Sequence, residues 1–112
     1  MVMTTKTPFS LSGKVAVITG FGSPKNALSN GSAIARLFAQ QDAVIEGLDI
    51  SAEDAQNTVE AITTAGGQAF FTSGNATVEA DINTWVKSVM QRHGRIDILI
   101  NNVGQSERLS LE

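Results

Sequence analysis

The chain has 112 residues, of which 42% are hydrophobic and 17% charged, a composition typical of one small globular domain. Its net charge is −3 and its eight basic residues are scattered, which argues against a nucleic-acid surface. Without cysteine there is no disulfide framework and no thiolate metal site, and no apolar run approaches the ~20 residues of a membrane span. The polar residues 1–13 lack the apolar stretch of a signal peptide, so we expect an N-terminal arm and a cytoplasmic protein.

A strand, a glycine-containing loop and a helix open the folded part of the chain. The continuous apolar run over 15–19 predicts a strand that is buried on both faces. The loop runs to Gly31, and residues 32–39 are typical of a helix. Backbone amides at such a helix start can hold a pyrophosphate, provided that no Cβ obstructs its approach. The alternative is an ordinary strand-to-helix loop that happens to contain glycine.

Two further helices alternate with three further strands in the rest of the chain. Glu46 and Gly47 interrupt the apolar residues of the second strand, which we therefore expect to be weak. Ser51 is placed to cap the second helix, and Gly66 to end it in a left-handed conformation. The ranges that we expect are strands over 44–49, 68–72 and 96–101, one helix between Ser51 and Gly66, and another over 79–92.

Apolar residues recur at helical spacing in both of these helices, and each set predicts one buried stripe. The stripes are Ala55, Val59 and Ile62 in the first of them, and Ile82, Trp85, Val86, Val89 and Met90 in the second. The order βαβαβαβ predicts an α/β fold of Rossmann type, with a parallel sheet in the strand order 3-2-1-4. Right-handed crossovers place the first two helices on one face and the third on the other, as in the truncated half of a doubly wound fold.

A carboxylate ends the second strand, where a dinucleotide-binding fold would use it. Asp49 stands close to the position at which an acidic side chain accepts hydrogen bonds from an adenosine ribose. No arginine or lysine follows it directly, so NAD is favoured over NADP, although Lys25 in the loop could partly reverse this preference. The alternative is a solvated carboxylate at the end of a strand.

The segment Asn101-Asn102-Val103-Gly104 follows the fourth strand directly. In a parallel sheet, ligands bind beyond the carboxyl ends of the strands, near the point where the strand order reverses. This segment and Thr19-Gly20 would flank that point, because the fourth strand should lie beside the first. Side-chain amides could hydrogen-bond the backbone there, and Gly104 would leave room for a ribose. The alternative is a polar turn.

Taken together, these segments resemble the short-chain dehydrogenase/reductase family. The resembling stretches are GKVAVITG (13–20), GSAIARLFA (31–39), LD (48–49) and GRIDILINNVG (94–104). The resemblance implies an NAD-binding half-domain over 14–105 with a tail over 106–112, taken from an oxidoreductase that acts on alcohol or carbonyl groups. The residues that it assigns to the cofactor are Thr19, Gly20, Gly22, Ser29, Asn30, Gly31, Asp49, Asn75, Ala76, Asn102 and Gly104.

The sequence departs from the family pattern at several points. The loop is longer than the usual Thr-Gly-x-x-x-Gly-x-Gly, and Ser29 stands where its middle glycine is expected. Asp42 replaces a glycine that commonly ends the first helix, and Asn75-Ala76 replaces an Asp-Val pair that contacts the adenine ring. The family's catalytic serine and Tyr-x-x-x-Lys pair lie further downstream, and this sequence contains no tyrosine. We therefore expect no turnover from this chain alone, since proton transfer needs such a group within reach of the substrate.

Other residues add no catalytic or metal site. His93, the single histidine, is placed as a cation at a helix end, and no set of residues has metal-ligand spacing. The fourth strand is rich in Ile and Leu and would form an exposed sheet edge, which favours association. We therefore expect a homodimer or higher homo-oligomer that covers the strand over 96–101. The alternative function is a catalytically inactive interaction module that self-associates through this strand.

Overall fold

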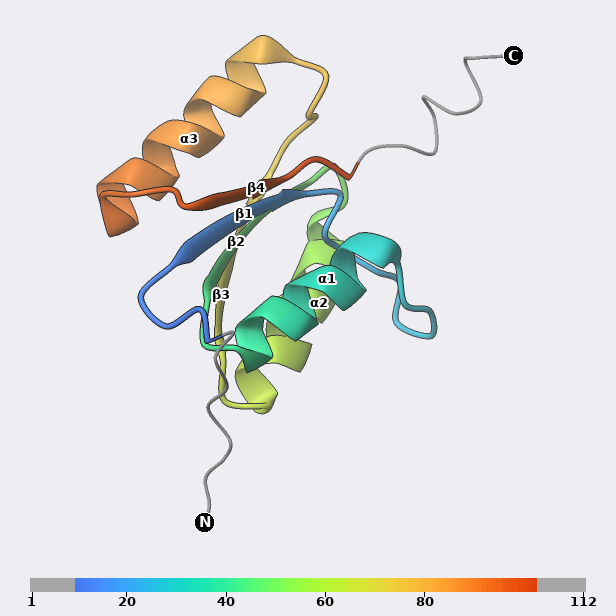
Figure 1. Cartoon of the computed structure of the whole chain (residues 1–112). Helices are drawn as coiled ribbons and strands as arrows, with labels where there is room; N and C mark the ends of the chain where they lie inside the picture. The colour runs from blue at the N-terminus through green and yellow to red at the C-terminus, as the bar shows by residue number, and fades with distance from the viewer. Residues whose placement is uncertain (1–9, 103–112) are drawn as a thin grey trace.

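The structure, a computed structural model, describes residues 10–102, so Gly104 and the tail over 106–112 lie outside the described residues. A parallel sheet has the order β3-β2-β1-β4, which confirms the predicted topology (Figure 1). The elements are β1 (Val15–Thr19), α1 (Asn30–Gln40), β2 (Val44–Asp49), α2 (Ala52–Thr64), β3 (Gln68–Ser73), α3 (Glu79–His93) and β4 (Ile98–Ile100). Leu11, which falls in the expected arm, packs against the core.

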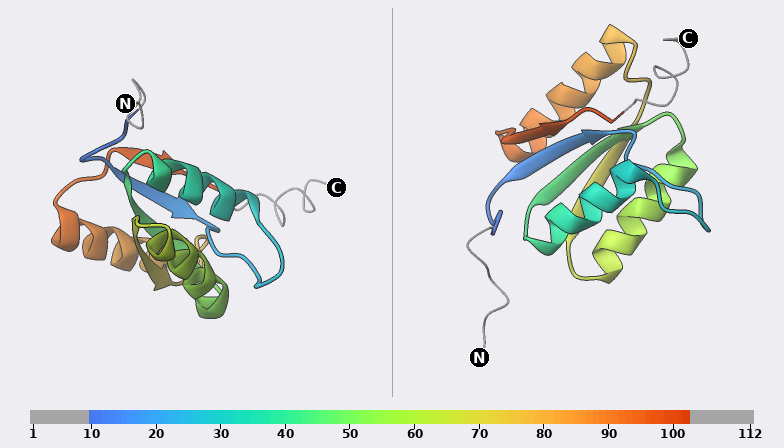
Figure 2. Two further views of the ribbon diagram at one scale, coloured as in Figure 1. Left: turned by 90° about the horizontal axis from the view of Figure 1, so that it is seen from below. Right: turned by 45° about the vertical axis from the view of Figure 1, so that its right-hand side comes forward.

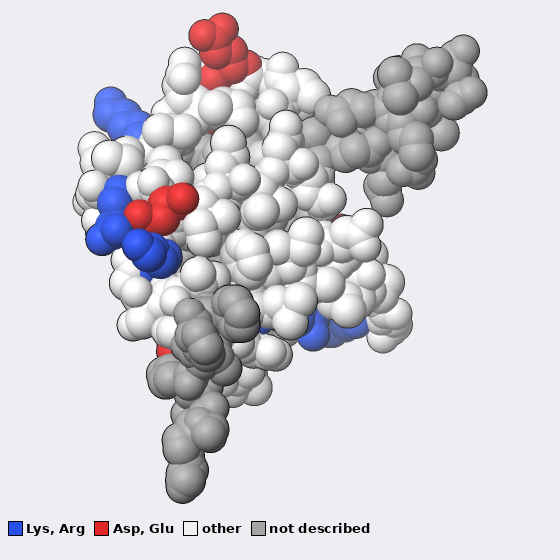
Figure 3. Space-filling model, in the orientation of Figure 1, with Lys and Arg blue, Asp and Glu red and all other residues white. Residues whose placement is uncertain are grey.

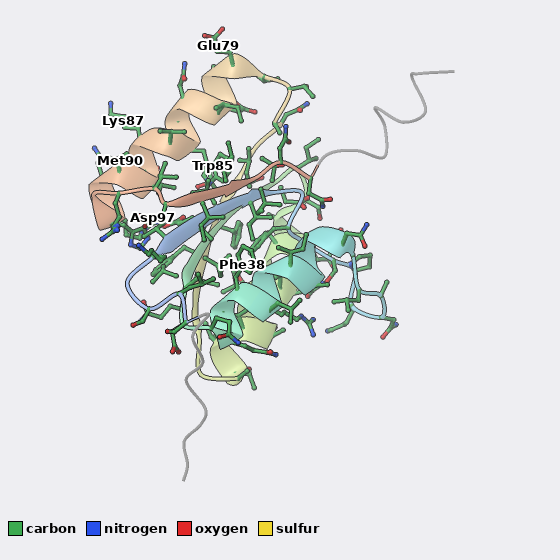
Figure 4. The ribbon with its side chains drawn as sticks, viewed as in Figure 1. Phe38, Glu79, Trp85, Lys87, Met90 and Asp97 are labelled. Atoms are coloured by element: carbon green, nitrogen blue, oxygen red, sulfur yellow. The ribbon has the colours of Figure 1, made fainter. Side chains whose placement is uncertain are left out.

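Two core clusters lie on opposite faces of the sheet. Helices α1 and α2 cover one face and α3 covers the other, as expected from right-handed crossovers (Figures 1 and 2). Alternate residues of β1 point to opposite faces: Ala16 belongs to the cluster beneath α1 and α2, and Val17 to the cluster beneath α3. Figure 4 shows Trp85 directed from α3 toward the sheet, where its side chain is buried. The prediction that Trp85 belongs to the core is confirmed.

The expected weakness of the second strand is wrong. β2 is continuous, and both residues that interrupt its apolar pattern have a structural reason. A Cβ on Gly47 would stand 2.3 Å from the ring of Phe21, so glycine leaves room for that buried side chain. Glu46 is fully buried toward α3, where its carboxylate pairs with Arg92 and lies 2.7 Å from His93 Nε2. A buried carboxylate therefore joins the middle of the sheet to the last turn of α3.

The helix ends explain two of the departures from the family pattern. α1 begins two residues earlier than expected, because the Oγ of Ser29 accepts the N–H of Ser32 at 3.0 Å and caps the helix. Asp42 has a φ of 75°, the left-handed conformation that glycine commonly supplies after a helix. The expected cap by Ser51 is confirmed, and so is the left-handed Gly66 with a φ of 96°.

The outermost apolar residues of the third helix are less buried than its spacing predicts. Val86 and Met90 are 38% and 44% exposed, whereas Val89 is fully buried. The buried stripe of α3 is therefore narrower than expected, because this helix packs across β1 and β2 without a neighbouring helix among the described residues.

Strand β4 is also shorter than the expected range 96–101. Before its first residue, the side chain of Asp97 takes the place of a backbone carbonyl in the pairing with β1. One carboxylate oxygen of Asp97 accepts the N–H of Val15 at 2.8 Å, and its own N–H donates to the Val15 carbonyl at 2.9 Å. The guanidinium of Arg95 donates to both carboxylate oxygens, at 2.8 Å each. The hydrogen bond from Arg95, followed by that from Val15, lowers the pKa of Asp97.

We predict that removing both of the side chains that contact Glu46 will destabilise the fold strongly. The double variant Arg92→Ala/His93→Ala leaves a buried carboxylate unpaired, which should lower the free energy of unfolding by about 3 kcal/mol. Urea unfolding would measure the loss. Adding Glu46→Leu should restore most of it, because the uncompensated charge is then gone. A double variant as stable as the wild type would contradict this role for Glu46.

We predict that Asp97 contributes stability that acid removes. Because its folded pKa lies below the ordinary value of about 3.9, the contribution is complete above that pH and is lost as pH falls through the folded pKa. The melting temperature of Asp97→Asn should therefore fall less between pH ~5 and ~2 than that of the wild type. Glu60→Gln on the exposed side of α2 is the control, and a parallel decline in all three proteins would contradict the prediction.

Candidate functional site

Most of the predicted site residues meet at the carboxyl end of the sheet, where α1 begins (Figure 1). Gly20 follows β1 directly with a φ of 61°, and a Cβ there would stand 2.2 Å from the carbonyl oxygen of Asn102. A Cβ on Gly31 would stand 2.1 Å from the carbonyl oxygen of Gly20. Both positions therefore require glycine, because backbone meets backbone at each of them.

Gly22 has a different role from that of the other two glycines. A Cβ on it would stand 2.7 Å from the backbone nitrogen of Ala55, so glycine lets the loop lie against α2. The N–H of Gly22 donates to Asp49 at 2.9 Å, and its carbonyl accepts the hydroxyl of Ser29 at 2.8 Å. Gly22 therefore shapes the loop, and both of its backbone hydrogen-bonding groups already have partners.

The first turn of α1 has unpaired backbone amides. Ser29 satisfies the amides of Ser32, through its hydroxyl, and of Ala33, through its carbonyl oxygen at 2.9 Å. The amides of Asn30 and Gly31 have no partner among the described residues. The first turns of α2 and α3 carry acidic residues, whereas that of α1 carries none. The positive end of the α1 dipole is thus uncompensated and suited to an anion.

Asp49 is tied to the loop rather than simply solvated. Its carboxylate oxygens accept the N–H groups of Gly22 and Ser51, each at 2.9 Å. A carboxylate offers about four acceptor positions. The side chain is half-buried and can therefore hold the loop while it accepts further hydrogen bonds from a ligand hydroxyl.

The segment after β4 is joined to the end of β1 by hydrogen bonds. The backbone N–H of Asn102 donates to the Thr19 hydroxyl at 2.7 Å, and its side-chain amide donates to the Gly20 carbonyl at 3.2 Å. The hydroxyl of Thr19 donates to the side-chain oxygen of Asn101 at 3.0 Å. Backbone and side-chain amides of the segment after β4 therefore bond to the end of β1, at the point where the strand order reverses. Asn101 lies in the segment that the sequence singled out, but it was not among the residues assigned to the cofactor.

The two residues that were predicted to contact the adenine ring follow β3. The side-chain oxygen of Asn75 accepts the N–H and the hydroxyl of Thr77, at 2.9 and 2.7 Å. Ala76 packs against the cluster beneath α3. The end of β3 does adjoin the site, because the N–H of Gly74 donates to the Asp49 carbonyl at 2.9 Å.

Helix α2 supports the loop with residues that the sequence did not indicate. The side-chain amide of Asn57 donates to the Ser23 carbonyl at 3.0 Å, and the hydroxyl of Thr58 donates to the Phe21 carbonyl at 2.9 Å. Thr58 shares the buried face of the helix with Ala55. Thr58 is a polar residue at helical spacing within an apolar stripe, and this pattern was the signal that could have revealed its role.

The charged side chains of the described residues do not gather into a second candidate site on the face in view. On the face shown in Figure 3, charged side chains lie at the margins and the basic ones form no broad patch. Within residues 10–102, no helix is both long and apolar enough to cross a membrane. In the same part of the chain, no group of three His, Asp or Glu side chains is arranged to hold a metal ion.

The family model of the short chain dehydrogenases matches residues 14–112. The chain belongs to the short-chain dehydrogenase/reductase family. An uncharacterised oxidoreductase of Thermotoga maritima is 41% identical over 92 residues, which are 82% of this chain and 34% of that protein. The short-chain dehydrogenase/reductase homolog YusS of Bacillus subtilis is 29% identical over 88% of this chain and 87% of its own length. The chain thus spans about a third of the first relative and most of the second.

Solved structures of the family share the same fold. A chain from Burkholderia xenovorans, described as a short-chain dehydrogenase/reductase, matches with a TM-score of 0.80 and 37% identity over 85% of this chain and 38% of its own. An oxidoreductase from Haemophilus influenza with bound NAD matches with a TM-score of 0.70 and 28% identity, over 80% of this chain and 30% of its own. A metagenomic short-chain oxidoreductase in complex with NADP matches with a TM-score of 0.71 and 31% identity, over 80% of this chain and 38% of its own. The family therefore binds nicotinamide dinucleotides of both kinds.

Proposed function

We propose that this chain is the dinucleotide-binding portion of an NAD-dependent oxidoreductase that acts on alcohol or carbonyl groups. The observation that carries the proposal is the pair of amides on Asn30 and Gly31, at the positive end of α1, which have no partner in the part of the chain that the structure describes. They lie beside the point where Gly20 and Gly31 let backbone segments meet without side chains, and the positive end of a helix suits a diphosphate. Asp49 stands at the end of the neighbouring strand, beside the same loop.

Asp49 supports NAD rather than NADP. Its carboxylate has acceptor positions left after binding two backbone amides, and the hydroxyls of an adenosine ribose could use them. A 2′-phosphate on that ribose would bring a second negative charge to the same place. Lys25 is exposed on the loop and forms no ion pair with a described residue, so it supplies no fixed counter-charge at Asp49.

The residues of this chain would bind and orient the cofactor. The amides of α1 would hold the diphosphate, and Asp49 would hold the ribose. When bound, the nicotinamide supplies hydride transfer. The proton donor of the family is a tyrosine, and a sequence without tyrosine would depend on a group outside these 112 residues. For this chain alone we propose cofactor binding without turnover of an alcohol or ketone.

We predict saturable binding of NADH, followed by fluorescence, with weaker binding of NADPH. Asp49→Asn should reduce the preference for NADH over NADPH, expressed as the ratio of their affinities, by about tenfold. The variant removes the charge that repels the 2′-phosphate but keeps one side-chain oxygen. The ratio is more informative than the affinity for NADH, because Asp49 also holds the loop. Glu53→Gln, an exposed carboxylate in the first turn of α2, is the matched control.

Two results would count against this proposal. If Asp49→Asn weakens both cofactors equally, Asp49 acts only on the loop and the NAD preference is wrong. If the wild type shows no binding at millimolar NADH, the dinucleotide site itself is wrong, and the interaction module described next becomes the better account.

The second candidate function is a self-associating interaction module. Leu99 pairs in register with Val17 and so points to the α3 face, yet it is 65% exposed. β4 is a sheet edge among the described residues, and bare edges with apolar side chains favour pairing with another chain. The similar length of YusS shows that the family includes a chain of this size. A second copy placed along β4 would cover both the edge and Leu99.

We predict that the wild type forms a homodimer or larger assembly at high micromolar concentration, measured by light scattering. Leu99→Lys should shift it to the monomer, because a buried lysine without a partner is costly at an interface. Leu37→Lys, at a 60% exposed position on α1, should not change the assembly. A wild type that stays monomeric would contradict the module.

A further inference from the structure

Three buried hydroxyls connect α2 to both ends of the loop between β1 and α1. Thr58 Oγ1 lies 2.9 Å from the carbonyl oxygen of Phe21 and 3.1 Å from Ser32 Oγ. Ser32 Oγ lies 3.4 Å from Ser23 Oγ. Phe21 and Ser23 begin the loop, Ser32 belongs to the first turn of α1, and all four residues are buried.

The three hydroxyls satisfy one another in one consistent order. Each hydroxyl has a single proton to donate and two lone pairs to accept. If Thr58 donates to the Phe21 carbonyl, Ser32 can donate to Thr58, and Ser23 can donate to Ser32. Every proton then has an acceptor, and Thr58 is the link through which the network reaches the loop backbone. Removing its hydroxyl leaves the buried Phe21 carbonyl without a partner.

Further contacts hold the same part of the loop against α2. The N–H of Ser23 donates to the Asp54 carbonyl at 3.1 Å, and the Ser23 carbonyl accepts the side-chain amide of Asn57 at 3.0 Å. Both backbone groups of Ser23 are therefore bonded to α2. Without a Cβ, Gly22 lies directly against the same helix. The loop that Asp49 holds from the sheet is thus held from its other side by α2.

We propose that Thr58 is a positioning residue for the dinucleotide. Its hydroxyl joins the start of the loop to the first turn of α1, and thereby keeps the amides of Asn30 and Gly31 at a fixed place relative to Asp49. Thr58 itself is fully buried, so it acts only through these neighbours. The inference rests on the proposed function, because its consequence is a change in cofactor affinity.

The affinity for the cofactor depends on how often the loop has its binding arrangement. When only a fraction of molecules is competent to bind, the apparent Kd rises in inverse proportion to that fraction. Thr58→Val keeps the shape of the side chain but removes the hydroxyl, so the arrangement with a bonded Phe21 carbonyl becomes less populated. Thr58→Ser keeps the hydroxyl and should preserve the arrangement.

The test combines NADH titration with hydrogen exchange of the protein without cofactor. Thr58→Val should raise the Kd for NADH about tenfold, equal to about 1.4 kcal/mol, and Thr58→Ser should stay close to the wild type. Amide exchange in the peptide over 20–30 should quicken in Thr58→Val, with no change in α3. The matched control is Thr63→Val, which removes a hydroxyl that donates to the Val59 carbonyl on the exposed side of the same helix.

The outcomes separate this inference from the proposed function. Unchanged loop exchange and unchanged affinity in Thr58→Val would overturn the positioning role. Equal quickening in the loop and in α3 would also overturn it, because Thr58 would then act only on global stability. If the wild type binds no NADH, the proposed function fails, whereas faster exchange confined to 20–30 would still show that Thr58 holds the loop.

Discussion

The direct backbone contact between the end of β1 and the start of α1 is the constraint on which the site depends. No side chain fits between the Gly20 carbonyl and Gly31, where a Cβ would stand 2.1 Å from the oxygen. Because the strand order places β4 beside β1, Asn102 arrives at the same point and bonds to Gly20. Three backbone segments therefore meet there, and the first amides of α1 are left without a partner in the described chain.

Strand β2 links this junction to the rest of the domain through successive side chains. Glu46 points to α3, where it pairs with Arg92 and contacts His93 in the last turn. Gly47 gives space to Phe21, which begins the loop, and Asp49 binds the Gly22 amide at the end of the strand. Because successive side chains of a strand point to opposite faces, β2 supports both the packing of α3 and the shape of the loop.

The loop owes its shape to contacts that are distant in sequence. Its greater length compared with the family pattern does not leave its first residues unsupported, since α2 holds both backbone groups of Ser23. Ser29, in place of the middle glycine, caps α1 and also bonds to Gly22. A substitution that departs from the family pattern therefore has a definite structural role here.

The order of the elements and the topology of the sheet could both be predicted from the amino-acid sequence. Alternating strands and amphipathic helices permit few arrangements, because parallel strands need right-handed crossovers. Sequence spacing also placed Gly20, Gly31 and Asp49 at the carboxyl end of the sheet. It did not predict that Glu46 would be buried in a continuous strand, because its partners Arg92 and His93 lie on α3, far along the chain.

The groups that hold the loop became evident from the packing of the elements in space. The roles of Asn57 and Thr58 depend on how α2 lies against Phe21 and Ser23, which no local pattern encodes. The same packing assigns the Gly22 amide to Asp49 and leaves the amides of Asn30 and Gly31 without a partner among residues 10–102. The physical reason is that periodicity reports which face of an element is apolar, whereas hydrogen-bond partners are chosen by the packing of those elements in space.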